Sequence, residues 1–169
     1  NDNREFFKIS KEEILDFFEL MDINPDIYSC QLADHLYYKY YNRFICTHTS
    51  RDCSWYEFRD HKWFASSFDN LLLIEFPNEI NNKLFKNQLL EEAKYLFLDE
   101  NFLNKLDENY HLIGFENGVY DLSQKTFRKG YPDDYISLST NCDYSEWSDK
   151  NPYASQIKLF FSQVLTNEN

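Results

Sequence analysis

The sequence has 169 residues, of which 43% are hydrophobic, and its formal net charge at neutral pH is −12. A chain of this size and hydrophobicity can bury a core, so a folded domain is expected rather than disorder. The negative charge argues against a protein whose whole surface grips nucleic acid, because phosphate binding depends mainly on Lys and Arg. No apolar run approaches the ~20 residues of a membrane span, and the four cysteines form no CxxC motif, so a soluble protein of a reducing compartment is expected.

The first predicted element is a short amphipathic helix. Ser10 and Glu13 have the spacing of a capping box, in which the two side chains satisfy backbone N–H groups at the start of a helix. The apolar positions that follow at helical spacing are Ile14, Phe17, Phe18 and Met21. We expect this helix to end near Pro25 and to serve only in packing.

A second helix is predicted over residues 29–44, and it carries a row of basic side chains. His35, Lys39 and Arg43 are spaced four residues apart, so they would share one helix face. Such a face could contact a phosphate backbone. The alternative is an ordinary solvated surface, which is the commoner role of charged residues on a helix.

A β-hairpin is predicted next, with strands over 54–58 and 63–64 and a turn over 59–62. Trp55 and Trp63 lie close together in the sequence, with Arg59 and Lys62 at the turn. Aromatic and basic side chains arranged in this way can stack a single-stranded base and contact its phosphates. The alternative, which we favour, is that both tryptophans are core anchors of the hairpin.

The middle of the chain is predicted to be helical and to form core rather than a site. A helical turn over residues 70–76 should stop at Pro77, because proline cannot continue a helix. Residues 78–98 carry apolar side chains at helical spacing. Asp99 can then cap a short helix that bears Phe102 and Leu106.

Residues 111–140 contain the clearest local fold signal. Asn117-Gly118 between two apolar runs predicts a hairpin with a type I′ turn, which requires positive φ at both positions. The predicted strand pairs are Glu116 with Val119, Phe115 with Tyr120, Gly114 with Asp121, and Ile113 with Leu122. Because side chains alternate along a strand, Ile113, Phe115, Tyr120 and Leu122 should share one face.

Three shorter elements and a last helix complete the prediction. Residues 126–128 should form a third strand, residues 132–134 a turn and residues 135–139 a further strand. Asn151 and Pro152 fit the N-cap and first position of a C-terminal helix. Its apolar face consists of Ile157, Phe160, Phe161 and Val164. Part of that face could pack against a partner outside this sequence.

These elements predict an α+β fold that is mostly helical, with two small antiparallel β-hairpin or sheet pieces and a C-terminal helix. We expect a helical lobe with the tryptophan hairpin over residues 1–98, a β-hairpin lobe over 99–150 and a terminal helix over 151–169. Together they should form one compact domain. Because the chain opens without Met, we expect it to be a piece of a larger protein.

The sequence offers no catalytic motif. A phosphate-binding G-x-x-x-x-G-K-[ST] loop is absent, so this chain alone should not bind or hydrolyse ATP. The adjacent Asp133-Asp134 is interpreted as a turn. The ligand types for zinc that lie close in sequence are Cys46, His48, Cys53 and His61. Their spacing fits no standard finger, so we expect no metal site. Nothing marks a third residue that would orient a Cys–His pair, so we expect no catalytic residue.

Seven basic residues are the candidates for contact with nucleic acid. They are Lys39, Arg43, Arg59 and Lys62 in one segment, and Lys125, Arg128 and Lys129 in another. Both segments stand out because most of the remaining sequence is acidic. If any surface of the protein faces DNA, these two segments are the ones expected to do so.

Three separated stretches carry a recognisable pattern. LIGFENGVYDL (112–122) is followed by FR (127–128), by PDDYISLST (132–140) and by the aromatic Tyr144. LADHLYYKYYNRFICT (32–47) is followed by SWYEFRDHKWF (54–64), and IKLFFSQVL covers 157–165. In their order along the chain, these stretches resemble the domain before the helicase core in pox-type and giant-virus DNA primase–helicases, including the helix that leads into the superfamily 3 core. Residues 66–98 match nothing in this pattern.

The resemblance implies a non-catalytic domain that joins primase to helicase, supports hexamer assembly as a collar and helps to guide DNA. It implies ATP and Mg²⁺ as cofactors of the larger enzyme and none for this chain. The implied partners are the adjacent helicase and primase domains, further copies of the chain and DNA, but no membrane. The implied location is a cytoplasmic viral replication site in the host cell. Two alternatives stay open: a module that binds single-stranded or forked DNA directly, and an acidic protein-interaction domain unrelated to replication.

Overall fold

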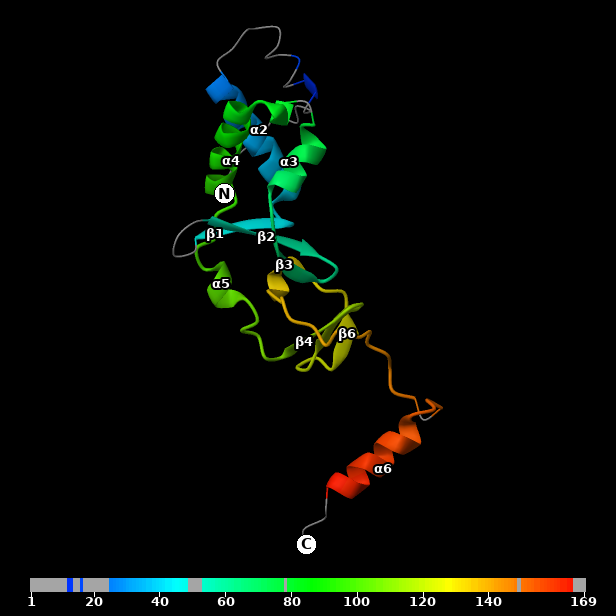
Figure 1. Ribbon diagram of the computed structural model, residues 1–169. Coiled ribbons are helices and arrows are strands. Elements are labelled where there is room, and N and C mark those ends of the chain that lie inside the picture. The colour runs from blue at the N-terminus through cyan, green and yellow to red at the C-terminus, as the bar shows by residue number, and fades with distance from the viewer. Residues whose placement is uncertain are drawn as a thin grey trace.

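The structure contains helices and two small antiparallel sheets, so the predicted α+β fold class is confirmed (Figure 1). The computed structural model describes residues 12–13, 16, 25–48, 53–77, 79–148 and 150–165. The helices are α2 (Pro25–Tyr40), α3 (Asp69–Glu75), η1 (Glu79–Asn81), α4 (Lys83–Leu96), α5 (Phe102–Lys105), η2 (Pro132–Asp134) and α6 (Ala154–Val164). The strands are β1 (Phe44–His48), β2 (Cys53–Arg59), β3 (Lys62–Ser66), β4 (Leu112–Phe115), β5 (Gly118–Asp121) and β6 (Thr126–Arg128).

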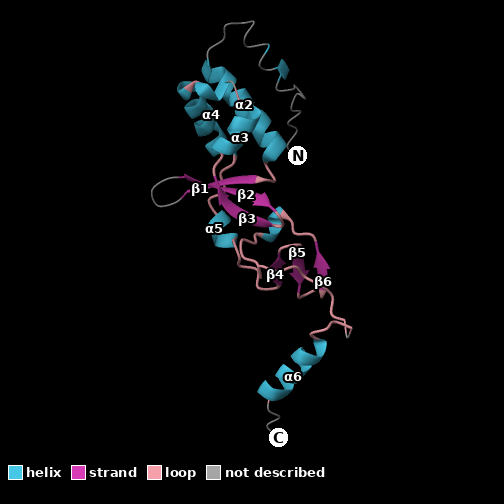
Figure 2. Ribbon diagram, turned by 45° about the vertical axis from the view of Figure 1, so that its right-hand side comes forward, coloured by secondary structure: helices cyan, strands magenta, loops and turns pink. Residues whose placement is uncertain are grey.

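Two antiparallel three-stranded sheets organise the chain. Sheet A has the order β1-β2-β3, and sheet B has the order β4-β5-β6. Helices α2, α3 and α4 lie beyond one side of sheet A, and sheet B lies on the other side (Figures 1 and 2). The main core forms where α2 and α4 meet α3 and sheet A, and Leu36, Leu72 and Leu89 are almost fully buried in it.

The tryptophan hairpin is confirmed, with Arg59 paired to Lys62 across a two-residue turn. Asp60 and His61 have φ values of 46° and 68°, so this turn, and not the predicted one, has the positive φ pair of a type I′ turn. Register places Trp55 and Trp63 on opposite faces of sheet A. Both are buried, and Trp55 stacks on Phe68 with ring centroids 4.0 Å apart. The interpretation of the tryptophans as core anchors is therefore correct.

Both edges of sheet A are closed by other segments of the chain. At the β1 edge, the backbone N–H of Cys46 donates to the carbonyl of Phe97, and the N–H of Asp99 donates to the carbonyl of Cys46, each at 2.9 Å. At the β3 edge, the N–H of Trp63 donates to the carbonyl of Ile136 at 2.7 Å. Each edge of sheet A is thus in contact with a further segment of the same chain.

Sheet B confirms the predicted hairpin but corrects its register. Phe115 pairs with Gly118 and Ile113 with Tyr120, so the turn residues are Glu116 and Asn117 rather than Asn117 and Gly118. The shift is by two positions, so every side chain keeps its predicted face although its partner changes. The predicted third strand is present as β6, and the predicted turn at 132–134 is η2.

The predicted strand over 135–139 is not formed. Tyr135 has a left-handed backbone with φ 50°, which interrupts an extended run. The carboxylate of Asp107 then accepts hydrogen bonds from the N–H groups of Ser137 (2.7 Å) and Leu138 (3.2 Å). A side chain thus takes the place that a neighbouring strand would have, and the segment is held without being a strand.

Several helix boundaries differ from those predicted. Helix α2 ends at Tyr40, and Phe44 opens β1, a strand that the sequence analysis missed because buried Phe44 also fits a helical period. Arg43 therefore does not share a helix face with His35 and Lys39. The capping box at Ser10 and the apolar positions of the predicted first helix lie outside the described residues.

Helix α4 begins at Lys83, later than predicted, because the side-chain oxygen of Asn82 caps it by accepting from Leu84 N–H (3.0 Å) and Phe85 N–H (3.3 Å). The last helix, α6, begins at Ala154 rather than Pro152, since Asn151 forms a turn before it. Among the helices of the described ranges, none combines the length and apolar composition that a bilayer crossing requires.

Candidate functional site

The tip of the tryptophan hairpin packs against sheet B and the segment that follows it, and we call this region the junction (residues 61–63, 114–118, 128–139). Trp63 is the anchor: its indole N–H donates to the carbonyl of Pro132 at 2.9 Å, and its ring meets Phe102 edge-on at 5.1 Å between centroids. A tryptophan buried with its N–H satisfied contributes both apolar area and orientation. The junction is therefore fixed from the hairpin side.

Lys62 makes the main charged contact across the junction. Its side chain is 11% exposed, and Nζ donates to Glu116 Oε1 at 2.7 Å and to Ser139 Oγ at 3.0 Å. The Ser139 hydroxyl also donates to Glu116. The hydrogen bond from Lys62, followed by that from Ser139, holds the pKa of Glu116 below its usual value. One ammonium thus ties β3, the β4–β5 turn and the 135–140 segment together.

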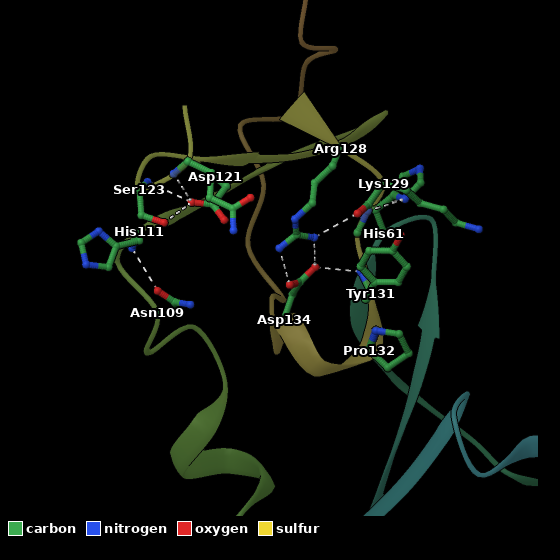
Figure 3. Close-up of polar contacts among 12 residues, drawn as sticks. His61, Asn109, His111, Asp121, Ser123, Arg128, Lys129, Tyr131, Pro132 and Asp134 are labelled. Atoms are coloured by element: carbon green, nitrogen blue, oxygen red, sulfur yellow. Dashed lines mark hydrogen bonds and ion pairs between the residues drawn. The ribbon is translucent and has the colours of Figure 1, made fainter. Parts of the chain in front are cut away.

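Arg128 and Asp134 form a second ion pair within the junction (Figure 3). The two guanidinium nitrogens donate to the two carboxylate oxygens at 2.8 and 2.7 Å, and Asp134 also accepts from Tyr131 N–H at 2.7 Å. Asp134 is the main reason that the pKa of Arg128 is raised. A bidentate pair of this kind fixes geometry as well as charge, so it locks η2 onto β6.

His61 also faces this segment (Figure 3). Its Nδ1 accepts a hydrogen bond from Gly130 N–H at 3.2 Å. A Cβ on Gly130 would lie 2.7 Å from the carbonyl oxygen of His61, so the close approach of the two segments requires glycine.

Two polar side chains of the LIGFENGVYDL stretch replace backbone contacts. The Asn117 carboxamide accepts from Tyr144 N–H (2.8 Å) and donates to the Tyr144 carbonyl (3.0 Å), as a neighbouring strand would. Asp121 Oδ1 accepts from the N–H groups of Ser123 (2.9 Å) and Gln124 (3.0 Å) and from the Ser123 hydroxyl (2.6 Å). The Ser123 hydroxyl is the largest cause of the lowered pKa of Asp121. The polar side chains of this stretch thus make hydrogen bonds within the domain.

Four of the seven basic candidates for nucleic-acid contact are engaged in ion pairs. Besides Lys62 and Arg128, Lys39 lies 2.9 Å from Glu75, and Arg43 lies 2.6 Å from Glu57. The hydrogen bond with Glu75 raises the pKa of Lys39. Each of these cations is neutralised locally, which weakens its attraction for a phosphate.

The other three candidates, Arg59, Lys125 and Lys129, are exposed and form no ion pair with another residue of the described ranges. The guanidinium of Arg59 lies over the Phe64 ring, 4.6 Å from its centroid. Lys125 precedes β6 and Lys129 follows it, so these two cations stand at opposite ends of a strand.

The structure brings together only two of the four residues weighed as zinc ligands. His48 and Cys53 pair across β1 and β2, with Nδ1 and Sγ 3.4 Å apart. Cys46 is fully buried, and His61 lies in the turn between β2 and β3, beyond the end of β2 that is far from Cys53. Within the part of the chain that the structure describes, no three His, Cys, Asp or Glu side chains are arranged to hold a metal ion.

A cavity of about 270 Å³ lies beside β4, lined among others by Asp107, Tyr110, Leu112 and Asp134. Both of its carboxylates are already bound, Asp107 by the Ser137 and Leu138 backbone and Asp134 by Arg128. Both carboxylates therefore serve to hold neighbouring segments of the junction in place. The sequence singled out residues 112–140, which include much of the junction. It gave no signal for the hydrogen bonds that link this stretch to Lys62 and Trp63.

Comparisons with known proteins give a consistent result. Residues 33–166 match the protein family described as "D5 N terminal like". A protein of Acanthamoeba polyphaga mimivirus named "Putative helicase L207/L206" is 34% identical over 155 residues, which cover 68% of this chain and 16% of that protein. "Putative helicase 121R" of Invertebrate iridescent virus 3 is 35% identical over 92 residues, which cover 54% of this chain and 10% of that protein.

A third relative, "Putative helicase 184R" of Invertebrate iridescent virus 6, is 40% identical over 100 residues, which cover 56% of this chain and 10% of that protein. The chain therefore spans between 10% and 16% of the lengths of these relatives.

Proposed function

This chain belongs to the D5 N terminal like family, and from that premise we propose that it is the non-catalytic domain that precedes and supports the ATPase core of a viral replication helicase. The names of its mimivirus and iridescent-virus relatives support the helicase context. Since the chain spans a small share of those relatives, the motor and its chemistry belong to the rest of the polypeptide. The domain's contribution is then positioning and assembly.

The observation that carries this proposal is the internal use of charged side chains at the junction. Lys62, Glu116, Arg128 and Asp134 are bound to one another and to neighbouring backbone, and they tie segments far apart in sequence. Charged side chains that are bound to one another in this way hold the fold rigid and are not set up for reaction with a substrate. The net charge of −12 also favours packing against protein over a general grip on DNA.

We propose further that the domain forms a collar that stabilises a hexameric ring and links it to an upstream primase. ATP and Mg²⁺ would bind to the ring, and this chain would supply no ligand to either. The domain would act at the viral replication site in the host cell. These roles follow the family resemblance, and the rigid, largely acidic body is compatible with them.

The collar role is tested by removing the domain from the full-length protein. The full protein and a version that lacks residues 1–150 are compared by sedimentation, with ATP binding as the control for an intact core. We expect the shortened protein to bind ATP but to sediment as smaller species, because the contacts that close the ring are lost. An intact hexamer without residues 1–150 would overturn the collar role.

A second candidate function, direct contact with single-stranded or forked DNA, rests on Arg59, Lys125 and Lys129, the exposed basic candidates. It predicts that the double variant Arg59→Glu/Lys129→Glu weakens DNA binding by the full protein and flattens its salt dependence. Arg43→Glu/Lys105→Glu is the control with the same change of charge, since Glu57 and Asp99 already neutralise these two cations. Equal effects of the double variant and the control would remove this candidate.

A further inference from the structure

Helix α6 presents a broad apolar stripe to solvent. Ile157, Phe160, Phe161 and Val164 lie within about 100° of one another on a helix that turns 100° per residue, and Leu165, the C-cap residue, follows them. Their exposed fractions run from 39% to 66%. Contiguous exposed apolar surface of this kind marks an interaction site in a soluble protein.

Within the part of the chain that the structure describes, no other element covers this stripe. Helix α6 stands clear of both sheets in two views, joined to them by an extended segment (Figures 1 and 2). The ring contacts of Phe160 and Phe161 are with each other, at 5.7 Å between centroids. Trp147 of the extended segment lies over Lys158, 5.9 Å from its Nζ, and Lys158 projects beside the stripe. The apolar side is thus left uncovered.

The composition and width of the stripe indicate what kind of partner fits it. Helix α6 contains one charged residue, Lys158, and no acid, whereas the chain as a whole carries a charge of −12. Interfaces with so few charges are typical of permanent contacts rather than transient ones. A stripe about 100° wide or wider is typical of a helix that faces a globular core, while a two-helix coiled coil uses a narrower seam.

We infer that α6 docks through this stripe into an apolar groove on the domain that adjoins it in the same polypeptide. The inference rests on the proposed function in one respect, namely that a further folded domain shares the chain. The relatives support this, because 84% to 90% of their lengths lie outside the matched region. A covalently attached domain is present at a high effective concentration, so it is favoured over a separate molecule as the occupant.

Hydrogen exchange of the α6 backbone amides tests the inference. A helix of 11 residues without packing is only marginally stable, so α6 should exchange rapidly in the chain of residues 1–169. In the full-length protein its amides should exchange on the order of 100-fold more slowly. Phe160→Glu in the full-length protein should abolish this protection, because a carboxylate cannot enter an apolar groove.

Leu159→Glu is the matched control. Leu159 is 59% exposed against 57% for Phe160, yet it projects from the opposite side of the helix. The same charge should therefore leave the protection of α6 unchanged. Exchange of the α2 and α4 amides should stay constant in both variants, which confirms that the body remains folded.

Three results would overturn the inference: equal exchange of α6 in the short chain and the full protein, equal effects of the two variants, or protection of the short chain that rises with its concentration. The last result would identify a second copy as the occupant. The proposed function is judged separately by the hexamer. An unprotected α6 in an intact hexameric helicase would refute the docking alone, and a protected α6 in a protein without a helicase ring would refute the function alone.

Discussion

Single glycines in sheet B are required by the close approach of neighbouring backbone. A Cβ on Gly114 would lie 2.4 Å from the carbonyl oxygen of Leu138 and 3.0 Å from Ile136 Cγ2. A Cβ on Gly118 would lie 2.5 Å from the carbonyl oxygen of Arg128. Backbone atoms cannot move aside as the end of a side chain can. These positions explain why two glycines occur in one short stretch of a chain that has three in all.

The first prediction concerns Gly114→Ala. The added methyl group must push the 136–140 segment away from β4, so the free energy of unfolding should fall by about 1–3 kcal/mol. Chemical denaturation of residues 1–169 measures the change. Glu108→Ala, at an exposed position, should stay within about 0.5 kcal/mol of the parent chain. A Gly114→Ala variant as stable as the parent would show that the two segments are not in close contact.

The second prediction concerns acid sensitivity at Asp121. Its pKa is lowered in the folded protein, so it stabilises the fold above the ordinary aspartate pKa of about 3.9, and this contribution is lost as pH falls through the folded value. Asp121→Asn should therefore be less stable than the parent chain at neutral pH, and the difference should shrink below about pH 4. Urea unfolding at a series of pH values measures it. Ser123→Ala removes one donor to Asp121, so it should reduce the loss of stability that the parent chain shows as pH falls. A stability difference between Asp121→Asn and the parent chain that does not vary with pH would contradict this account.

At the level of elements, polar side chains decide where strands and helices stop. Asn82 sets the start of α4, and Asp107 holds the 137–138 backbone that would otherwise need a strand beside it. Neither role follows from the periodicity of apolar residues, which is the main signal for an element's type. The prediction of element types was therefore better than the prediction of their ends.

The third prediction compares two arginine pairs by the same substitution. Arg128→Lys loses the two-pronged contact with Asp134, whose side chain is 10% exposed, so stability should fall by about 1–2 kcal/mol. Arg43 is 52% exposed, against 29% for Arg128, and it contacts a single oxygen of Glu57, so the effect of Arg43→Lys should be below about 0.5 kcal/mol. Thermal or urea unfolding measures both. If the two variants lose the same stability, the Arg128–Asp134 pair does not lock η2 to β6.

At the level of the whole molecule, the described body and α6 are separate in their energetics. The body gains from pairing of residues 140–144 with sheet B: Thr140 N–H donates to the Gly114 carbonyl, and the Tyr144 ring stacks on Phe127 at 4.4 Å. Helix α6 stands apart from this packing (Figure 1). Loss of the helix and loss of the 140–144 segment should therefore have different consequences.

The fourth prediction uses two truncations. A chain ending at residue 148 should unfold within about 0.5 kcal/mol of the full 169 residues, since it loses only α6 and its approach. A chain ending at residue 139 should lose more than about 2 kcal/mol, because it gives up several hydrogen bonds and an aromatic stack. Denaturant unfolding measures both. A large loss in the longer truncation would show that α6 packs on the body after all.

The sequence alone determined the α+β class, the tryptophan hairpin, the hairpin at Asn117-Gly118 and the family to which the chain belongs. These depend on local spacing and turn chemistry, which are written in consecutive residues. The faces of sheet B were also correct, because a register shift of two leaves the alternation of side chains intact.

Only the tertiary structure decided the register of that hairpin and which basic residues form ion pairs. The turn moved to Glu116 because its side chain meets Lys62 and Asn117 meets Tyr144, both contacts with distant parts of the chain. Four of the seven basic candidates for nucleic-acid contact proved to be partners of carboxylates 6 to 54 positions away in the sequence. Charge along a sequence does not say which charges meet in space, and that is the physical reason why the junction could not be predicted.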